Sequence, residues 1–377
     1  MRLNIPYQEL QLIPYEGAGN RTPLLNIGVI KGISNRNPTD VKKILENDIN
    51  FRNYIVEKGT TLEADSIMIF YKVRGEEFDF VTFIGEPNAP VTSKFSTMCG
   101  NGIRALALHI VLTENNFFIR EKFLRDGIRI WAGGVKTIRV ESFDATLNEG
   151  TISVEMGPFM CSKNALVSYV NSQFIRTETL KSLSITDLPN PILTEGFQLG
   201  IGFNGEEDGE PHLVMLSPWE NYCTLLTRIG IKSKPSSRKE ILDSLRRVVC
   251  FIGLHITFDQ EIFPQGINVN LALTLNDGIY MSTHERNLSS GKDECFDLFQ
   301  KNEYCRCNTM ACGTGGAAVV NIAHLQRQTG EDIFTTYHPG GKIDYFLSTG
   351  QTIMIGPAKR VLSDLNLKEG GILNDTR

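Results

Sequence analysis

Short apolar segments dominate the hydrophobic pattern of this chain, and stretches with helical spacing lie between them. Runs rich in β-branched and aromatic residues predict strands at 66–71, 78–84, 137–140 and 150–154. Apolar residues that recur every three or four positions predict helices at 40–58, 102–113, 238–249 and 315–327. The mixture predicts an α+β protein whose sheet is mostly antiparallel.

Length and composition narrow the class of protein. The chain has 377 residues, of which 41% are hydrophobic, so two domains with real cores are expected. A net charge of −5 disfavours a nucleic-acid binder and a polybasic membrane-surface protein. Because the N-terminus lacks a signal-like apolar stretch and no run approaches a membrane span, we expect a soluble, cytoplasmic protein. Its eight cysteines should then be thiols.

A faint internal repeat suggests how the domains are organised. Cys99–Ala105 (CGNGIRA) is echoed by Cys312–Ala318 (CGTGGAA), and each copy precedes an apolar helical run. The simplest interpretation is two similar domains, each with one Cys at the start of a helix. The first is expected at 1–140, completed by the tail 354–377, and the second at 141–353.

The two Cys-Gly-x-Gly turns suggest a specific chemistry. Glycines before a helix leave backbone N–H groups open to a ligand, and a helix N-terminus attracts anions. The same field can lower the pKa of a thiol. Two such cysteines flanking one carboxylate could invert the neighbouring carbon, one thiolate removing a proton and one thiol returning it from the opposite face. This chemistry needs neither pyridoxal phosphate nor a metal, so no cofactor is expected.

Two alternatives compete with this interpretation. Each Cys could be a small buried hydrophobe, which is the commonest fate of a free cysteine. A metal- or redox-responsive site is the other alternative, because four cysteines lie within eighteen residues at Cys295, Cys305, Cys307 and Cys312. Their irregular Cys-x-Cys spacing is unlike that of zinc motifs.

At these residues the chain resembles the diaminopimelate epimerase family, which are cofactor-independent amino-acid epimerases. Met98–Arg104 and Ala311–Gly316 are similar to the family's two catalytic-cysteine motifs and appear in the family's order. Weaker matches run along the rest of the chain, at Gly17–Asn20, Gly209–His212, Phe263–Asn270, Thr283–Arg286, Pro339–Lys342 and Gly356–Ala358.

The resemblance implies two pseudo-symmetric domains, each a strongly curved sheet around a central helix, with the site in the cleft between them. It implies an isomerase of lysine biosynthesis in which Cys99 and Cys312 are the acid/base pair, His212 supporting Cys99 and Glu285 supporting Cys312. The reacting carboxylate would be held by the N–H groups of Gly100, Asn101, Gly313 and Thr314. The rest of the substrate would contact Asn20, Asn268 and Arg286.

Several departures from the family pattern concern the substrate. Glu210 replaces the family's Asn before Pro-His, and Ser66 replaces a Gln. Segments near 169–193 and 287–308 look inserted, and Asn88 is only a candidate match. Diaminopimelate is therefore the leading substrate, with histidine or another cationic amino acid as the alternative, since Glu210 would repel a distal carboxylate. The expected partner is this amino acid, with neither nucleic acid nor membrane, and a homodimer stays open.

Overall fold

One continuous sheet runs through the whole molecule. The computed structural model describes residues 5–35, 37–73, 77–87, 95–162, 198–204, 212–228, 234–257, 266–286, 307–327, 332–348 and 350–361. Within these ranges hydrogen-bonded pairs connect the strands in the order β1-β4-β5-β6-β7-β8-β9-β18-β17-β16-β14-β13-β12-β11-β10. Most pairs are antiparallel, and the parallel ones are β4–β5, β6–β7, β12–β13 and β14–β16. The predicted α+β class is confirmed.

The N-terminal half of the structure comprises the strands and helices up to residue 157. Its strands are β1 (Leu12–Ile13), β2 (Tyr15–Gly17), β3 (Asn20–Arg21), β4 (Leu24–Asn26), β5 (Ile67–Lys72), β6 (Phe80–Gly85), β7 (Ile128–Trp131), β8 (Val135–Asp144) and β9 (Glu149–Gly157). Its helices are η1 (Tyr7–Glu9), η2 (Ile33–Asn35), α1 (Pro38–Glu46), α2 (Ile49–Thr61), α3 (Gly100–Thr113) and α4 (Phe117–Asp126).

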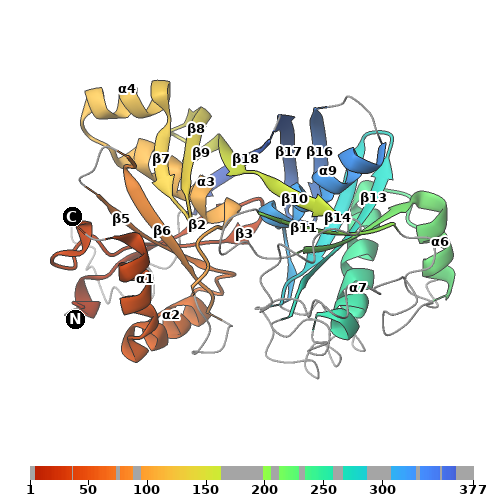
Figure 1. Ribbon diagram of the computed structural model, residues 1–377, viewed down its shortest axis with the longest axis horizontal. Helices are drawn as coiled ribbons and strands as arrows, with labels where there is room; N and C mark the ends of the chain where they lie inside the picture. Colours follow the sequence, from red (N-terminus) through yellow and green to blue (C-terminus); the bar gives the residue numbers. More distant parts are fainter. Residues whose placement is uncertain are drawn as a thin grey trace, which may run out of the picture.

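The C-terminal half follows it along the long axis of the molecule (Figure 1). Its strands are β10 (Phe159–Ser162), β11 (Gln198–Asn204), β12 (His212–Pro218), β13 (Asn268–Leu275), β14 (Gly278–His284), β15 (Asn308–Thr309), β16 (Ile333–His338), β17 (Gly341–Ser348) and β18 (Gln351–Arg360). Its helices are α6 (Trp219–Arg228), α7 (Arg238–Ile256) and α9 (Gly313–Arg327).

One helix in each half packs against many strands. Helix α3 contacts β2, β5, β8, β9 and β18, and α9 contacts β10, β11, β12, β13, β17 and β18. Apart from Arg104, both are almost entirely apolar where they enter the core, with Ile103, Ala105–Leu108 and Ala317–Val320 fully buried. A helix that is apolar on every side needs neighbours all around it, which the strands of a bent sheet provide.

The strands between these central helices and the outer helices do not alternate apolar with polar residues, because helices cover both faces of the sheet. In β5, Met68 and Phe70 belong to the core around α3, while Ile67, Ile69 and Tyr71 pack towards α1 and α2. In β12 and β13 the same division occurs between α9 and the pair α6 and α7. Each half is therefore built as a central helix, a sheet layer and an outer helix layer.

The outer helices of the N-terminal half depart from the sequence prediction. A single helix was expected over 40–58, but the chain forms α1 and α2 with a break at Asn47 and Asp48. The Asp48 carboxylate accepts hydrogen bonds from the N–H groups of Asn50 and Phe51 at 3.0 and 3.1 Å. This cap allows a second helix to begin at Ile49. The N–H groups of a first helical turn have no backbone partner within the helix, and an Asp side chain at the N-cap accepts hydrogen bonds from them.

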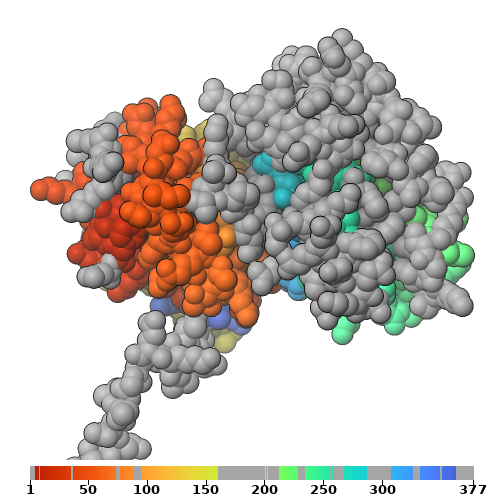
Figure 2. All heavy atoms as spheres, turned by 90° about the horizontal axis from the view of Figure 1, so that it is seen from below, coloured from red at the N-terminus to blue at the C-terminus, as the bar shows by residue number. Residues whose placement is uncertain are grey.

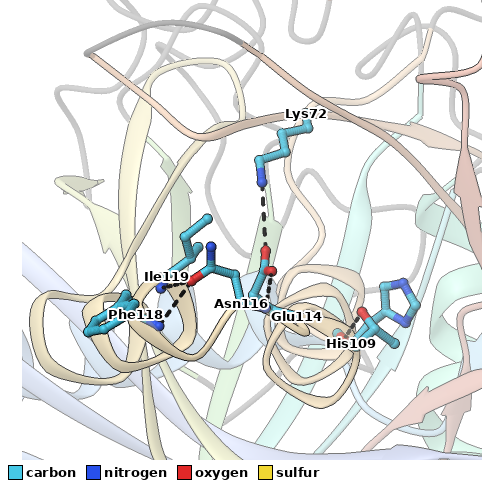
Figure 3. A network of polar contacts seen from close by, with 7 residues as sticks. Lys72, His109, Glu114, Asn116, Phe118 and Ile119 are labelled. Atoms are coloured by element: carbon cyan, nitrogen blue, oxygen red, sulfur yellow. Dashed lines mark hydrogen bonds and ion pairs between the residues drawn. The ribbon is translucent and has the colours of Figure 1, made fainter.

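The far end of α3 is fixed by polar contacts (Figure 3). Lys72 on β5 lies 3.7 Å from the carboxylate of Glu114, the residue that ends α3. Asn116 then accepts hydrogen bonds from the N–H groups of Phe118 and Ile119, which start α4. These contacts fix the end of α3 and the start of α4.

Strand β18 joins the two halves. It pairs with β17 through Asp344↔Ile355 and with β9 through Ile355↔Ser153, and its last residues pair with β2. Strand β8 runs through residue 140 and pairs with β9. The pairing therefore groups 141–157 with the N-terminal half, while the predicted domain limits and their pseudo-symmetry remain predictions. Residues 163–197, 287–306 and 362–377, which contain most of the predicted insertions and the tail, lie outside the described residues.

The surface seen from below shows the two halves at opposite ends of the molecule (Figure 2). Red and orange side chains of the N-terminal half, including α1 and α2, lie at one end, and green side chains of the C-terminal half lie at the other. Within the described ranges, no helix is both long and apolar enough to cross a lipid bilayer.

Candidate active site

Both cysteines of the sequence repeat stand at the start of a central helix. Cys99 is the N-cap of α3, and its Sγ accepts a hydrogen bond from the N–H of Gly102 at 3.5 Å. The Sγ of Cys312 accepts the equivalent bond from the N–H of Gly315, the third residue of α9, at 3.3 Å. In both turns the sulfur occupies the place of a capping oxygen, so the helix field acts directly on it.

The starts of α3 and α9 face each other across Met354 of β18. A Cβ built on Gly100 would lie 2.6 Å from Met354 Cε and 3.6 Å from the Cα of Gly313. A Cβ built on Gly313 would lie 2.8 Å from Met354 Sδ and 3.5 Å from the Cα of Gly100. Glycine at both positions therefore lets the two helix N-termini approach closely, and both present backbone N–H groups to one space.

A single cavity of about 60 Å³ lies at this junction, and both cysteines line it. Cys99 is half-buried, and Cys312 has 6% of its surface exposed. The cavity also brings together eight other residues that the sequence nominated, namely Asn20, Ser66, Gly100, Asn101, Asn268, Glu285, Gly313 and Thr314. Segments separated by more than 200 residues thus meet at one site.

Strand geometry explains two of these positions. Side chains on one face of a strand recur every second residue. Ser66 therefore shares the α3-facing side of its segment with Met68 and Phe70, and its Oγ lies 3.9 Å from the Sγ of Cys99. In β13, Asn268 and Asn270 share the face of Ala272, which packs towards α9.

Two other predicted residues are placed differently. His212 is completely buried at the start of β12, where its ring lies 3.2 Å from the amide of Asn270, and it is not among the described residues that line the cavity. The backbone N–H of Arg286 donates to Asn268 Oδ1 at 2.9 Å, and its side chain is likewise not part of the described lining. Glu210 and Asn88 lie outside the described residues.

Asn20 lines the cavity, but its amide is engaged by the chain that leads to Cys312. Its Oδ1 accepts hydrogen bonds from the N–H groups of Met310 and Ala311 at 3.0 and 3.3 Å. Its Nδ2 donates to Thr309 Oγ1 and to the carbonyl of Ala311. Asn101 from α3 donates to the same carbonyl at 2.9 Å. Two amides of the N-terminal half therefore hold the residue just before Cys312, which gives Asn20 a structural task that the motif did not indicate.

Sequence reasoning missed an acidic part of the lining. Besides Glu285, the cavity is bordered by Asp65 and Glu86, and by the less polar Ile84, Ser96, Met98, Thr309 and Ala311. Asp65 accepts a hydrogen bond from the N–H of Arg21 at 2.8 Å. Asp65 directly precedes Ser66, and Glu86 directly follows β6, so their positions beside recognised strands were the available signal.

Burial is the largest influence on the pKa values of the two thiols that line the cavity. It raises the pKa of Cys99, against the lowering effect of the N–H of Gly102 and the hydroxyl of Ser66, and the charge of Glu285 raises it further. Burial raises the pKa of Cys312 well above its ordinary value, and Glu285 adds to the shift. The sequence led us to expect lowered thiol pKa values. The direction is opposite, because loss of water and a nearby carboxylate outweigh the helix N-terminus.

The cysteine-rich segment before Cys312 is described only from residue 307. Cys307 is buried, and its carbonyl accepts a hydrogen bond from the N–H of Glu285 at 2.7 Å. Cys295 and Cys305 lie outside the described residues. In the part of the chain that the structure describes, no three His, Cys, Asp or Glu side chains are grouped to hold a metal ion.

Known proteins similar to this chain include epimerases. No model of a known protein family matches the chain. A diaminopimelate epimerase of Corynebacterium aurimucosum is 26% identical over 266 residues, which are 70% of this chain and 68% of the relative. One from Corynebacterium glutamicum strain R is 22% identical over 312 residues, 81% of this chain and 83% of the relative.

Among solved structures, a hydroxyproline epimerase from Agrobacterium vitis with bound trans-4-hydroxy-L-proline superposes with a TM-score of 0.54. It is 14% identical and covers 96% of this chain and 91% of that chain, so the likeness shows a shared fold. The resemblance to the diaminopimelate epimerases is confirmed by the relatives of that name. These relatives support an amino-acid epimerase or racemase, and hence an isomerase.

Proposed function

We propose that the protein inverts the α-carbon of an amino acid without a cofactor, with Cys99 and Cys312 as the two acid/base groups. The observation that carries the proposal is the shared cavity: both thiols line it, and each caps a helix that starts with glycine. Other buried cysteines of the chain, such as Cys223 on α6 and Cys250 on α7, do not line this cavity. The pair is therefore distinguished by its position beside two helix N-termini.

The substrate carboxylate is assigned to the N-termini of α3 and α9. The N–H groups of Gly100, Asn101, Gly313 and Thr314 belong to the first turns of these helices or border them, where backbone donors have no partner within the helix. When the α-proton leaves, negative charge moves onto the carboxylate, and fixed donors stabilise it. Each such donor contributes about 3 kcal/mol in other enzymes that stabilise an oxyanion.

Proton transfer follows from the two sulfurs. One thiolate takes the α-proton and becomes a thiol, while the C–H electron pair delocalises into the carboxylate. The opposite thiol then returns a proton to the carbon and becomes a thiolate, so the two exchange roles and the configuration is inverted. A substrate brings an ammonium group close to Glu285 and the thiols, and a positive charge beside a thiol lowers its pKa. The ammonium group of a substrate therefore offsets the effect of burial and Glu285 on the pKa values of the two thiols.

Diaminopimelate is the leading substrate, converted from the LL to the meso form. Support comes from relatives that are named diaminopimelate epimerase and from Asn268, which lines the cavity as the resemblance implied. A role in lysine biosynthesis belongs to this same proposal, as do the supporting roles of His212 and Glu285.

A cationic amino acid is the second candidate, and a specific observation favours it. Asp65, Glu86 and Glu285 all border the cavity, and carboxylates attract a distal ammonium, guanidinium or imidazolium group while repelling a distal carboxylate. Histidine, lysine and arginine are therefore tested beside diaminopimelate.

The deciding experiment is deuterium uptake from D₂O at the α-carbon, followed by NMR for diaminopimelate, histidine, lysine, arginine and proline with reduced, folded protein. Uptake with inversion in one of them is expected. A double variant, Cys99→Ala with Cys312→Ala, is the matched control and should show none. Absence of uptake across the panel would remove the proposal.

A further inference from the structure

A completely buried arginine lies beneath the junction of the two central helices. Arg104 belongs to the first turns of α3 and has 0% of its surface exposed. Its Nη2 donates to Asn101 Oδ1 at 2.7 Å, and its Nη1 lies 3.3 Å from Met354 Sδ. Its Nε is buried with no hydrogen-bond partner among the described residues, none of which places a carboxylate within ion-pair distance of the guanidinium.

Such a group is costly to the folded state. A buried charge loses its hydration, and without a paired carboxylate this loss is not regained. Burial lowers the pKa of Arg104 only to about 10, so the side chain remains charged at neutral pH. Apolar residues of similar volume are often neutral or stabilising at such positions. Packing alone therefore gives little reason for an arginine here.

The position of Arg104 provides a reason. Met354, which its Nη1 contacts, is the residue against which Gly100 and Gly313 both pack. Asn101, which its Nη2 orients, lines the cavity and donates to the carbonyl of Ala311. The guanidinium therefore contacts two residues, Met354 and Asn101, that lie between it and the cavity. It lies behind the backbone N–H groups that are assigned to the substrate carboxylate.

Charge balance shows why a cation is needed there. The cavity is bordered by the carboxylates of Asp65, Glu86 and Glu285. Against them, two helix N-termini supply together about one positive charge. Arg21 and Arg246 offset part of the charge of Asp65, and Arg52 offsets part of that of Glu86. None of the three is on the described lining, where no Lys, Arg or His adds a positive charge, whereas Arg104 lies behind the helix N-termini themselves.

We propose that Arg104 is a positioning residue whose buried charge lets the two helix N-termini bind a carboxylate beside three acidic side chains, and whose hydrogen bond fixes the orientation of Asn101. This inference rests on the proposed carboxylate site and deepens it. It assigns the anion selectivity of the cavity to a side chain that does not touch the substrate.

Alkylation of Cys99 tests the proposal without a known substrate. Iodoacetate carries a carboxylate and iodoacetamide does not, so the ratio of their rate constants at Cys99 reports the local field. Rates are measured by peptide mass spectrometry in wild type, Arg104→Gln and Arg104→Lys. The glutamine keeps a donor for Asn101 and loses the charge, whereas the lysine keeps the charge. We expect the ratio to fall about tenfold in Arg104→Gln and by less than about twofold in Arg104→Lys.

Equal ratios of the iodoacetate and iodoacetamide rate constants in all three proteins would overturn the proposal. An equal fall in both variants would also overturn it, because the effect would then come from lost packing and not from lost charge. If Arg104→Gln does not fold, the wild type still decides. Its ratio at Cys99 must be higher in the folded than in the denatured protein, and a ratio that is not higher overturns the proposal. A protein that shows this selectivity but exchanges no α-proton would retain the role of Arg104 and lose the proposed epimerase activity.

Discussion

The two cysteine turns have the same local design but different surroundings. Each sulfur caps a helix and accepts an N–H from the third residue of that helix. Cys99 is half-buried and has Ser66 beside it at 3.9 Å. Cys312 is almost inaccessible, has Thr314 Oγ1 at 3.4 Å, and follows a segment clamped by Asn20 and Asn101. The difference indicates that one thiol is set by its own half of the molecule, while the other is placed by residues of the opposite half.

The largest expected effect comes from removing either sulfur. Cys99→Ala and Cys312→Ala should each lower the rate of inversion by at least about 10³-fold, since a general acid or base contributes about 10²–10⁴-fold and inversion needs both. Each single variant should still exchange the α-proton of one enantiomer, and opposite enantiomers for the two variants. Deuterium incorporation into each enantiomer measures this. Identical preferences in both variants would show that the thiols do not work from opposite faces.

Asn20→Ala removes the hydrogen bonds that hold the segment before Cys312 and leaves the turn of Cys99 intact. It removes the hydrogen bonds to Met310, Thr309 and Ala311 in a buried place, where unsatisfied groups cost about 1–3 kcal/mol each. We expect the free energy of unfolding to fall by about 2–3 kcal/mol, measured by urea denaturation. Alkylation by iodoacetamide should quicken at Cys312 and change little at Cys99. A variant with wild-type stability would contradict the structural role of Asn20.

Those contacts mark the limit of what the sequence could predict. The glycine turns disclosed both cysteines because the chemistry of a helix N-terminus is local. Ser66 and Asn268 were found through motif order. Ser66 directly precedes β5 and Asn268 begins β13, and the alternation of side chains along these strands accounts for their orientation. The partner of Asn20 lies about 290 residues away, and no local pattern carries such a pairing. For Asp65 and Glu86 the only local signal was a position beside a predicted strand, and only the folded chain brings them to the cavity of Cys99 and Cys312.

The raised thiol pKa values have the same origin. A sequence shows the helix that lowers a pKa, but burial and the charge of Glu285 depend on tertiary packing. The separation of α1 from α2 did have a local signal, because Asp48 is a typical N-cap residue. The apolar residues keep helical spacing across this position, so the sequence pattern predicted one helix instead of two.

Glu285→Gln should reduce the difference between the pKa values of Cys99 and Cys312. Burial is the largest cause of the raised pKa at both thiols, and the charge of Glu285 raises both further; at Cys312 a hydrogen bond with the Glu285 side chain raises the pKa again. Removing its charge should therefore lower the pKa of Cys312 more than that of Cys99. In both proteins alkylation by iodoacetamide accelerates as pH rises, because only the thiolate reacts.

The variant should shift this acceleration to lower pH at Cys312 by a larger amount than at Cys99. Rate constants from pH 7 to 10.5 for each cysteine, read by mass spectrometry, give the two shifts. Glu86→Gln, at another acidic position of the same cavity, is the matched control for charge removal. A larger pH shift at Cys99 than at Cys312 would contradict the assignment of Glu285 to Cys312 and would pair it with Cys99 instead.

The smallest effects concern the hydroxyl beside each sulfur. Ser66→Ala removes the group 3.9 Å from Cys99, and Thr314→Val removes the one 3.4 Å from Cys312. Each hydroxyl lowers the pKa of its thiol, so each variant should raise the pKa of the nearby cysteine only. Because the contact in the second turn is shorter, Thr314→Val should slow iodoacetamide alkylation at pH 8.5 by about threefold and Ser66→Ala by less, within the net value of one hydrogen bond. Since the two turns lie in one cavity, each variant is the control for the other. A change at the distant cysteine as large as at the near one would mean that the thiols titrate as a single coupled pair.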